Sequence, residues 1–148
     1  MYQRKPSWCA PAAIQMAMHA YGRKMGQARI ARTIGTTEDG TDSPGILQGL
    51  QRLGFVPRVI DTRRKADARS WLVGLDGPAL LCVDSWDHWV CVAGGCRDRL
   101  WLMDPSPDVW NHTRLGRWLL KPDTILKRWR ASRKLQQSGG AYYGIALE

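Results

Sequence analysis

The stretch Cys9–Gly22 limits the possible folds more than any other part of the sequence. Its apolar residues recur at helical spacing, and alanines and methionines fill the adjoining stripe, so the predicted helix is apolar on most sides. Such a helix is stable only when other elements bury it. Pro11 is tolerated only in a first turn, which places the helix start at Cys9 or Ala10, and Gly22 is expected to end it. The chain must therefore build a core around this helix.

Further periodic segments predict helices first and strands second. Helices are expected at Gln27–Ile34 and from Ser43 to Gly54, the latter with Ser43 as its cap residue and Pro44 in its first turn. The remaining segments are strands Phe55–Ile60, Pro78–Asp84, His88–Ala93, Arg99–Asp104 and Ala141–Leu147, and helices Ala66–Leu75 and Pro122–Leu135. Short turns separate the three middle strands, so they are expected to form an antiparallel meander. This order, with no linker, predicts one α+β domain over residues 1–148, its N-terminal helices packed on an antiparallel sheet.

The charge of the chain is its one unusual compositional feature. The 148 residues carry a formal net charge of +9, which predicts an anionic partner such as nucleic acid, an acidic protein or a membrane surface. Basic residues are dense in segment 114–134. They are Arg114, Arg117, Lys121, Lys127, Arg128, Arg130, Arg133 and Lys134. The simpler interpretation of this segment is a solvated helix face, and the functional one is a docking surface for an acidic substrate or nucleic acid, although no nucleic-acid motif accompanies it.

The sequence predicts neither a membrane span nor export. No apolar stretch approaches the ~20 residues of a spanning helix, and the N-terminus lacks the apolar core of a secretory signal, so a cytoplasmic, reducing location is expected. Cys82 and Cys91 fall in apolar strands and are interpreted as buried thiols, although the even cysteine count also allows two bridges. A zinc site made of Cys91, Cys96 and two histidines lacks paired ligand spacing. No metal and no cofactor are expected.

Three residues occupy positions that a thiol hydrolase requires. Cys9 starts a buried helix, whose unpaired amides and dipole favour a thiolate. His88 opens an apolar strand beside a turn, where its ring could take the thiol proton. Asp104 ends the next strand, and if the two strands pair as a hairpin it lies beside His88 and can hold the ring. Gln3 is a fourth candidate, because its amide could point at the developing oxyanion together with the Cys9 N–H.

Simpler interpretations stand beside each of these assignments. Asp104 alone would be a turn-opening Asp-Pro residue, and Gln3 alone a solvated N-terminal residue. The whole set could also be a decayed, non-catalytic copy of such a site. His19 lies on the apolar helix and is interpreted as a boundary residue, and His112 as an exposed loop residue.

Several segments together resemble a known family. They are Gln3 with Cys9-Ala-Pro-Ala-Ala, Asp-His88-Trp-Val-Cys-Val-Ala-Gly, Leu-Trp-Leu-Met-Asp104-Pro, the helical segment Ser43–Phe55 and the closing segment Tyr142–Leu147. Over nearly its whole length the chain resembles the papain-like cysteine peptidases that remove double-glycine leaders from bacteriocin precursors, and their stand-alone bacterial relatives. The resemblance implies a bacterial or phage protein with a papain-like fold, a Cys9–His88–Asp104 triad and Gln3 in the oxyanion hole.

Two features depart from that family pattern. The family usually has Gly after the nucleophile, whereas this chain has Ala10, whose methyl group could crowd a substrate backbone. Leader-processing members are usually fused to an exporter, and the sequence shows no membrane domain.

The predicted reaction is hydrolysis of a peptide bond in a peptide or protein substrate. Deamidation of a side chain, or transfer to an amine, would use the same groups. The rival interpretation is a non-catalytic papain-like module that docks nucleic acid or an acidic protein through its basic surface. Salt dependence separates the two, because phosphate-driven binding weakens steeply as salt rises.

Overall fold

The chain folds as one antiparallel sheet with helices on both faces. A computed structural model describes residues 1–84, 87–95, 98–108, 116–130 and 140–148. The strands are β1 (Pro57–Thr62), β2 (Ala79–Val83), β3 (His88–Ala93), β4 (Leu100–Met103), β5 (Arg117–Leu120) and β6 (Tyr142–Leu147). They form a six-stranded sheet in the order β1-β6-β2-β3-β4-β5, in which every neighbouring pair is antiparallel. The predicted α+β class and the middle meander are both confirmed.

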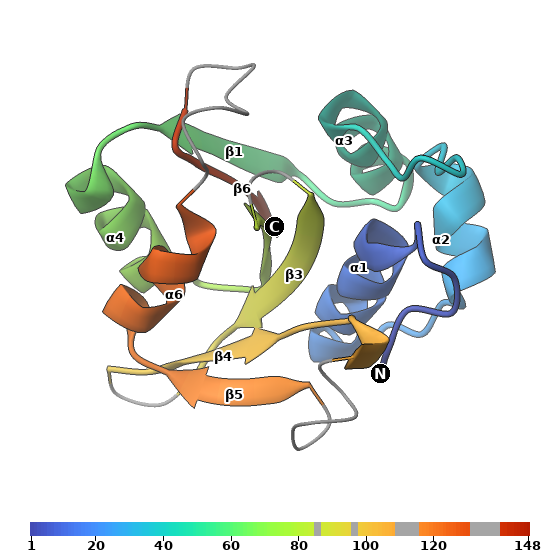
Figure 1. Cartoon of the computed structure of the whole chain (residues 1–148). Coiled ribbons are helices and arrows are strands. Elements are labelled where there is room, and N and C mark those ends of the chain that lie inside the picture. Colours follow the sequence, from blue (N-terminus) through green and yellow to red (C-terminus); the bar gives the residue numbers. More distant parts are fainter. Residues whose placement is uncertain (85–86, 96–97, 109–115, 131–139) are drawn as a thin grey trace.

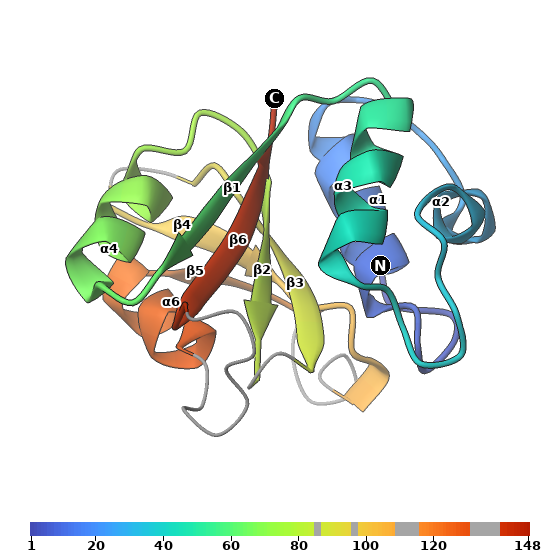
Figure 2. The ribbon, with the colours of Figure 1, turned by 90° about the horizontal axis from the view of Figure 1, so that it is seen from above.

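The helices divide between the two faces of the sheet. The first set is α1 (Cys9–Ala20), α2 (Gln27–Thr33) and α3 (Ser43–Arg52), and the second is α4 (Lys65–Val73) and α6 (Pro122–Trp129). Figures 1 and 2 show the first set on one face and the second set on the other. We call these sets the front layer and the back layer. Among the described residues, no helix is both long and apolar enough to cross a bilayer.

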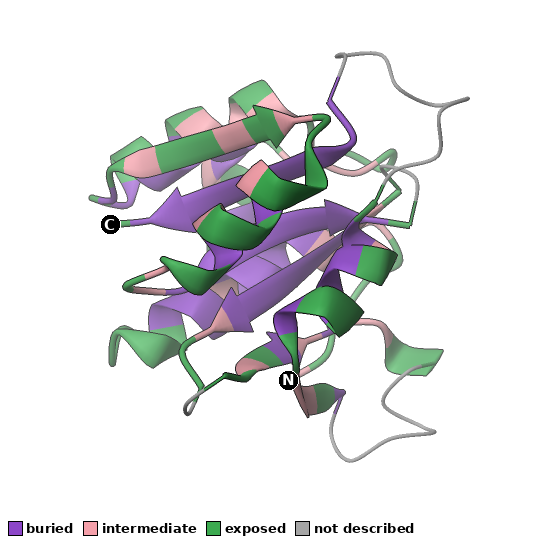
Figure 3. Ribbon diagram, turned by 90° about the vertical axis from the view of Figure 1, so that its left-hand side faces the viewer, coloured by how far each residue is buried: buried purple, intermediate pink, exposed green. Residues whose placement is uncertain are grey.

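Each layer encloses its own apolar core against the sheet. Along β3, Trp89 and Cys91 belong to the front core, whereas Val90 and Val92 belong to the back core, as the period-two alternation of a strand requires. The central strands are therefore buried on both faces, as Figure 3 shows by their colour. This explains why β2 and β3 are continuous apolar runs in the sequence.

Helix α1 lies where its sequence predicts. It begins at Cys9, with Pro11 in the first turn, and Ala10 and Ile14 are fully buried in the front core. Gly22 has a φ of 69°, which glycine adopts at little cost, and the helix ends just before it. Packing of α1 against β3 fixes the position of Cys9 relative to the sheet.

Two helix boundaries correct the sequence prediction. The cap of α3 is Asp42 rather than Ser43, because the Asp42 carboxylate accepts a hydrogen bond of 2.7 Å from the backbone N–H of Gly45. Helix α6 ends at Trp129 rather than Leu135, since Arg130 already has an extended backbone. Residues 131–135 of the predicted helix lie outside the described residues.

Strand β5 was not predicted at all. Its residues fall in the basic segment 114–134, where charge obscured a short apolar run. Leu119 pairs with Trp101 of β4, so β5 extends the meander by one strand. The other elements differ from their predicted bounds by at most two residues.

Candidate active site

The predicted site residues meet at one end of the sheet. Strand β3 is antiparallel to both β2 and β4, so the start of β3 lies beside the ends of the other two. Asp84 follows β2, His88 starts β3 and Asp104 follows β4, which places all three at this end. The hairpin prediction that would bring His88 and Asp104 together is confirmed.

His88 lies between Asp104 and Cys9. Its Nε2 is 2.8 Å from Oδ1 of Asp104, and Cys9 is near enough to help raise the pKa of the ring. Because Nε2 faces the carboxylate, the contact with the thiol falls to Nδ1. Cys9 itself stands at the first residue of α1, where the described residues provide no side-chain cap. Cys9 therefore lies at the positive end of the helix dipole.

The surroundings of His88 favour its charged form. Burial lowers the pKa of His88, but hydrogen bonds to Asp104 and Cys9, together with the charges of both groups, outweigh burial and raise this pKa to about 9. A protonated imidazole beside a thiol is the arrangement that stabilises a thiolate.

Asp104 is fully buried and is held on both carboxylate oxygens. Oδ1 accepts hydrogen bonds from His88 and from the backbone N–H of Ser106, the latter at 2.8 Å, and Oδ2 lies 2.6 Å from Nη1 of Arg128. Burial raises the pKa of Asp104, but the hydrogen bond and charge of His88, the Ser106 amide and the Arg128 charge together lower it. The surroundings of Asp104 therefore favour its ionised form beside His88.

A cavity of about 370 Å³ opens beside Cys9. Its walls are Pro6, Ser7, Cys9, Glu38, Asp39, Gly40, Thr41, Asp87 and Trp89. Trp89 packs edge-on against Tyr143 in the front core and is thereby a fixed wall. Ala10 is not among these residues. Its methyl group is buried in the front core.

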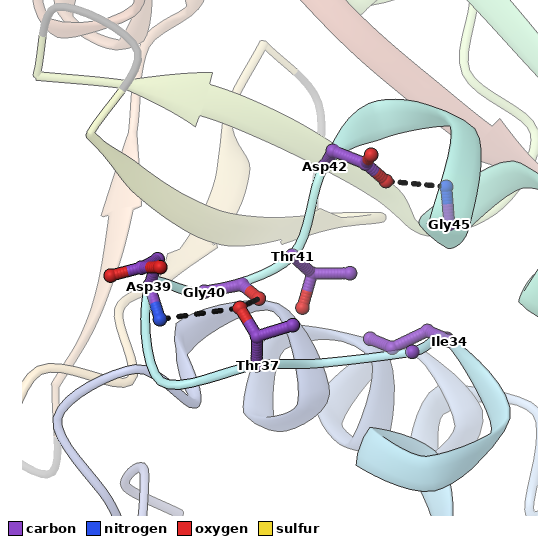
Figure 4. A pocket seen from close by; sticks show the side chains of 8 residues that line it. Ile34, Thr37, Asp39, Gly40, Thr41, Asp42 and Gly45 are labelled. Atoms are coloured by element: carbon purple, nitrogen blue, oxygen red, sulfur yellow. Dashed lines mark hydrogen bonds between the residues drawn. The ribbon is translucent and has the colours of Figure 1, made fainter.

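A second cavity, of about 410 Å³, adjoins the first and shares Asp39, Gly40 and Thr41 with it (Figure 4). The wall between the two cavities is a tight turn, in which the backbone N–H of Asp39 donates to Thr37 Oγ1 and Thr37 pairs with Gly40. No spacing rule marks this turn as a cavity wall, because its neighbours come from distant parts of the chain.

Gln3 is buried near the site, but its amide points at the N-terminal segment. Its Nε2 donates to the carbonyl oxygens of Lys5 at 3.1 Å and Pro6 at 2.6 Å. Its backbone N–H donates to the carbonyl of Pro105, the residue after Asp104, at 2.8 Å. Gln3 thus joins the wall residue Pro6 to the Asp104 turn, and its role toward an oxyanion stays a prediction.

Gln27 clamps the segment that carries Gln3, and the sequence analysis missed it. Its Oε1 accepts from the backbone N–H of Arg4 at 3.0 Å, and its Nε2 donates to the Tyr2 carbonyl at 2.8 Å and to Gln15 Oε1 at 3.1 Å. The two residues that flank Gln3 are thus fixed by one side chain, which is itself only 3% exposed. A glutamine at the start of a predicted helix gives no local signal of such a role.

The remaining candidates lie apart from this site. Cys82 and Cys91 are buried free thiols; burial, with nearby negative charges, raises the pKa of Cys82 to about 12, and burial raises that of Cys91. His19 is exposed on α1. Cys96, His112, Arg114, Arg133 and Lys134 lie outside the described residues. In the described part of the basic segment, Lys127 and Arg130 are exposed, whereas Arg128 turns inward to Asp104.

Taken with the α+β architecture, this site defines the class of papain-like cysteine peptidases. The family is given by a match of residues 1–129 to the Peptidase C39 family. The chain belongs to the C39 peptidase family and is a cysteine peptidase. Among curated proteins, none matches the sequence at a significant level.

Solved structures share the fold at low sequence identity. The peptidase domain of Streptococcus ComA, a bifunctional ABC transporter involved in quorum sensing, has a TM-score of 0.71 and 19% identity, with 100% of this chain and 97% of that chain covered. A double-glycine-motif protease from an AMS/PCAT transporter, solved with a leader peptide, has a TM-score of 0.70 and 13% identity over 99% and 88%. A C39-like peptidase from Bacillus anthracis has a TM-score of 0.57 and 9% identity over 97% and 90%.

Proposed function

We propose that this peptidase cleaves its substrate through a Cys9–His88–Asp104 triad. The observation that carries the proposal is the position of His88, whose Nε2 lies 2.8 Å from Oδ1 of Asp104 and whose pKa the neighbouring Cys9 helps to raise. The nucleophile, the base and the group that orients the base are thereby neighbours, in the order that the chemistry needs.

In the proposed reaction the Cys9 thiolate attacks the carbonyl carbon of the scissile peptide bond. The tetrahedral intermediate collapses when the His88 imidazolium gives its proton to the leaving nitrogen, so the C–N bond breaks and a thioester remains on Cys9. His88, now neutral, takes a proton from water, and the hydroxide that forms attacks the thioester. The product acid leaves, and the proton on His88 restores the thiolate–imidazolium pair. Asp104 stays ionised throughout and holds the ring in place.

The oxyanion requires donors that face the substrate carbonyl. The Cys9 N–H at the start of α1 is one, and the Gln3 amide is the second. For Gln3 to donate, one of its two hydrogens has to leave the carbonyl of Lys5 or Pro6. The bond to Lys5 is the longer of the two, at 3.1 Å against 2.6 Å, and is the one we expect to be exchanged.

The substrate class that we propose is a peptide with two glycines before the scissile bond. The support is the family, together with the double-glycine-motif protease that shares this fold. Carboxylates of Glu38, Asp39 and Asp87 line the cavity beside Cys9, although the chain as a whole has a net charge of +9. An acidic substrate segment would meet like charges there, so we expect any acidic partner to dock away from this cavity.

A non-catalytic docking module remains the competing function for the basic surface. Exposed Arg117, Lys121, Lys127 and Arg130 would be its described part. Binding of nucleic acid through these residues should weaken steeply with salt, whereas peptide cleavage should persist.

The decisive test compares the wild-type protein with Cys9→Ala on a synthetic double-glycine leader peptide, with products identified by mass spectrometry. Cleavage after the second glycine that disappears in Cys9→Ala supports the proposal, and a mass gain of one unit or an amine adduct would instead indicate deamidation or transfer. Near wild-type turnover by Cys9→Ala would overturn it.

Iodoacetamide labelling, mapped to each cysteine, tests the Cys9–His88 pair without a substrate. Cys9 should react faster than the buried Cys82 and Cys91, and more slowly in His88→Ala than in the wild type.

A further inference from the structure

We propose that Arg128 is a positioning residue of this active site, whose guanidinium, anchored by Asp84, fixes the carboxylate of Asp104 against His88. The inference rests on the triad proposed above and adds to it a residue from the opposite layer of the molecule. Nothing in the family resemblance or in the local sequence pattern assigned a role to Arg128.

All three nitrogens of the Arg128 guanidinium lie close to carboxylate oxygens. Its Nε and Nη2 lie 3.2 and 2.7 Å from Oδ1 and Oδ2 of Asp84. The remaining nitrogen, Nη1, lies 2.6 Å from Oδ2 of Asp104. A guanidinium is planar and rigid, so the two-point contact with Asp84 determines where Nη1 points. Arg128 is thus held in one orientation before it contacts Asp104.

The contact matters because of where Asp104 lies. Its side chain is completely buried, so its charge is not screened by solvent. Oδ1 is occupied by His88 and the Ser106 amide, and Arg128 meets the other oxygen. A turn of the carboxylate about its Cβ–Cγ bond would break contacts on both oxygens. The guanidinium therefore resists the one motion that would withdraw Oδ1 from His88.

Arg128 reaches Asp104 from the far side of the sheet. It lies in the last turn of α6, next to Trp129, which is completely buried in the back core. Asp104 stands two residues beyond Leu102, another member of the back core. The packing of α6 on the sheet thus carries the guanidinium to the catalytic end, and Asp84 at the end of β2 holds it there.

The charges around Asp104 predict how the site responds to the loss of Arg128. The charged groups that face Asp104 include His88 from β3 and Arg128 from α6, with Cys9 behind the first and Asp84 behind the second. The Arg128 charge is one of the causes that lower the pKa of Asp104. Without it, Asp104 binds a proton at higher pH and no longer supports the His88 imidazolium. The acid limb of the Cys9 alkylation profile, which is the pH range over which the alkylation rate falls on acidification, should then move to higher pH.

The first experiment measures Cys9 alkylation by iodoacetamide across pH in Arg128→Met, Arg128→Lys and the control Lys127→Met. Lys127 is the neighbouring residue on α6 and is exposed, so the control removes the same charge from the same helix. In Arg128→Met we expect the acid limb to move up and the cleavage of the double-glycine peptide to fall about 10- to 100-fold in kcat/KM. Arg128→Lys should restore part of the wild-type alkylation profile and part of the cleavage rate. Lys127→Met should match the wild type in both measurements.

The second experiment is a double-mutant cycle with Asp104→Asn. If Arg128 acts through Asp104, Arg128→Met should have little further effect on kcat/KM in that background, because the two changes remove one interaction. Asp84→Asn should lower the rate in the same direction but less, since Arg128 then loses only its anchor. Asp84 is half-exposed, so Asp84→Asn should fold normally. If circular dichroism shows that Arg128→Met does not fold, the cleavage rate of Asp84→Asn tests the role of Arg128 instead.

The outcomes separate this inference from the proposed function. Failure of wild-type Cys9 to react selectively, or activity in Cys9→Ala, overturns the triad itself. A normal wild-type profile with an unshifted acid limb in Arg128→Met overturns only the role of Arg128. If the effects of Arg128→Met and Asp104→Asn on kcat/KM are fully additive, the role of Arg128 is also overturned, because Arg128 would then merely stabilise α6.

Discussion

The front and back layers hold the same end of the sheet by different means. In the front layer, α1 is buried on most sides and carries Cys9, while neutral amide hydrogen bonds from Gln27 fix the N-terminal segment with Gln3. In the back layer, α4 and α6 pack through one apolar face each, and among the described residues Arg128 is the charged side chain that reaches the site. The difference teaches that apolar packing decides where each element lies, whereas a few polar contacts at the sheet end orient the reacting groups.

Asp104→Asn should have the largest effect on the reaction, because Asp104 contacts both His88 and the Arg128 guanidinium from the back layer. Asparagine keeps the shape but not the charge, so the imidazolium loses its support, and Arg128 loses one of its two carboxylate partners. We expect kcat/KM on the double-glycine peptide to fall on the order of 10²- to 10⁴-fold. Asp108→Asn, an exposed residue four positions on, is the control. A loss of less than about threefold would mean that Asp104 has no part in the chemistry.

Leu72→Ala tests whether the back layer contributes stability without chemistry. Leu72 is completely buried in the back core on α4, so its truncation should lower the free energy of unfolding by about 2–5 kcal/mol in urea denaturation. The pH profile of Cys9 alkylation in the folded protein should stay as in the wild type. A shifted profile would show that the whole back layer, and not Arg128 alone, sets the site.

The ion pair at the site also predicts how stability changes with pH. The pKa of His88 is raised from 6.5 to about 9, so its contribution to stability is fully present below pH 6.5 and is lost as pH rises through 9. The free energy of unfolding should therefore fall across that window in urea titrations at successive pH values. His88→Asn should abolish this slope. An equal slope in the variant would assign it to other groups.

Gln27→Leu tests the neutral clamp of the front layer, and its effect on the reaction should be smaller than that of Asp104→Asn. The change removes the hydrogen bonds of Gln27 to the Tyr2 carbonyl and the Arg4 N–H, which loosens the segment around Gln3. We expect about a tenfold loss of kcat/KM, with Cys9 alkylation unchanged, because alkylation forms no oxyanion. Gln51→Leu, at an exposed position of α3, is the control. If alkylation falls as much as cleavage, Gln27 supports α1 rather than Gln3.

The sequence by itself determined most of the elements and the order of the site residues. The apolar stripes and Pro11 placed the start of α1 at Cys9, and the short turns between the apolar middle strands placed His88 and Asp104 at the ends of a hairpin. These features follow from local periodicity and from antiparallel pairing of neighbouring strands, both of which act over short stretches of chain. The family resemblance rested on the same residues.

Only the tertiary structure decided which side chains support them. Arg128 and Lys127 are equally basic neighbours on one helix, yet one is bonded to Asp84 and Asp104 and the other is exposed. Gln27 and the turn at residues 37–41 likewise gain their roles from parts of the chain far away in sequence. Such contacts depend on how the layers pack on the sheet and on the register of its strands, and local periodicity carries no information about either.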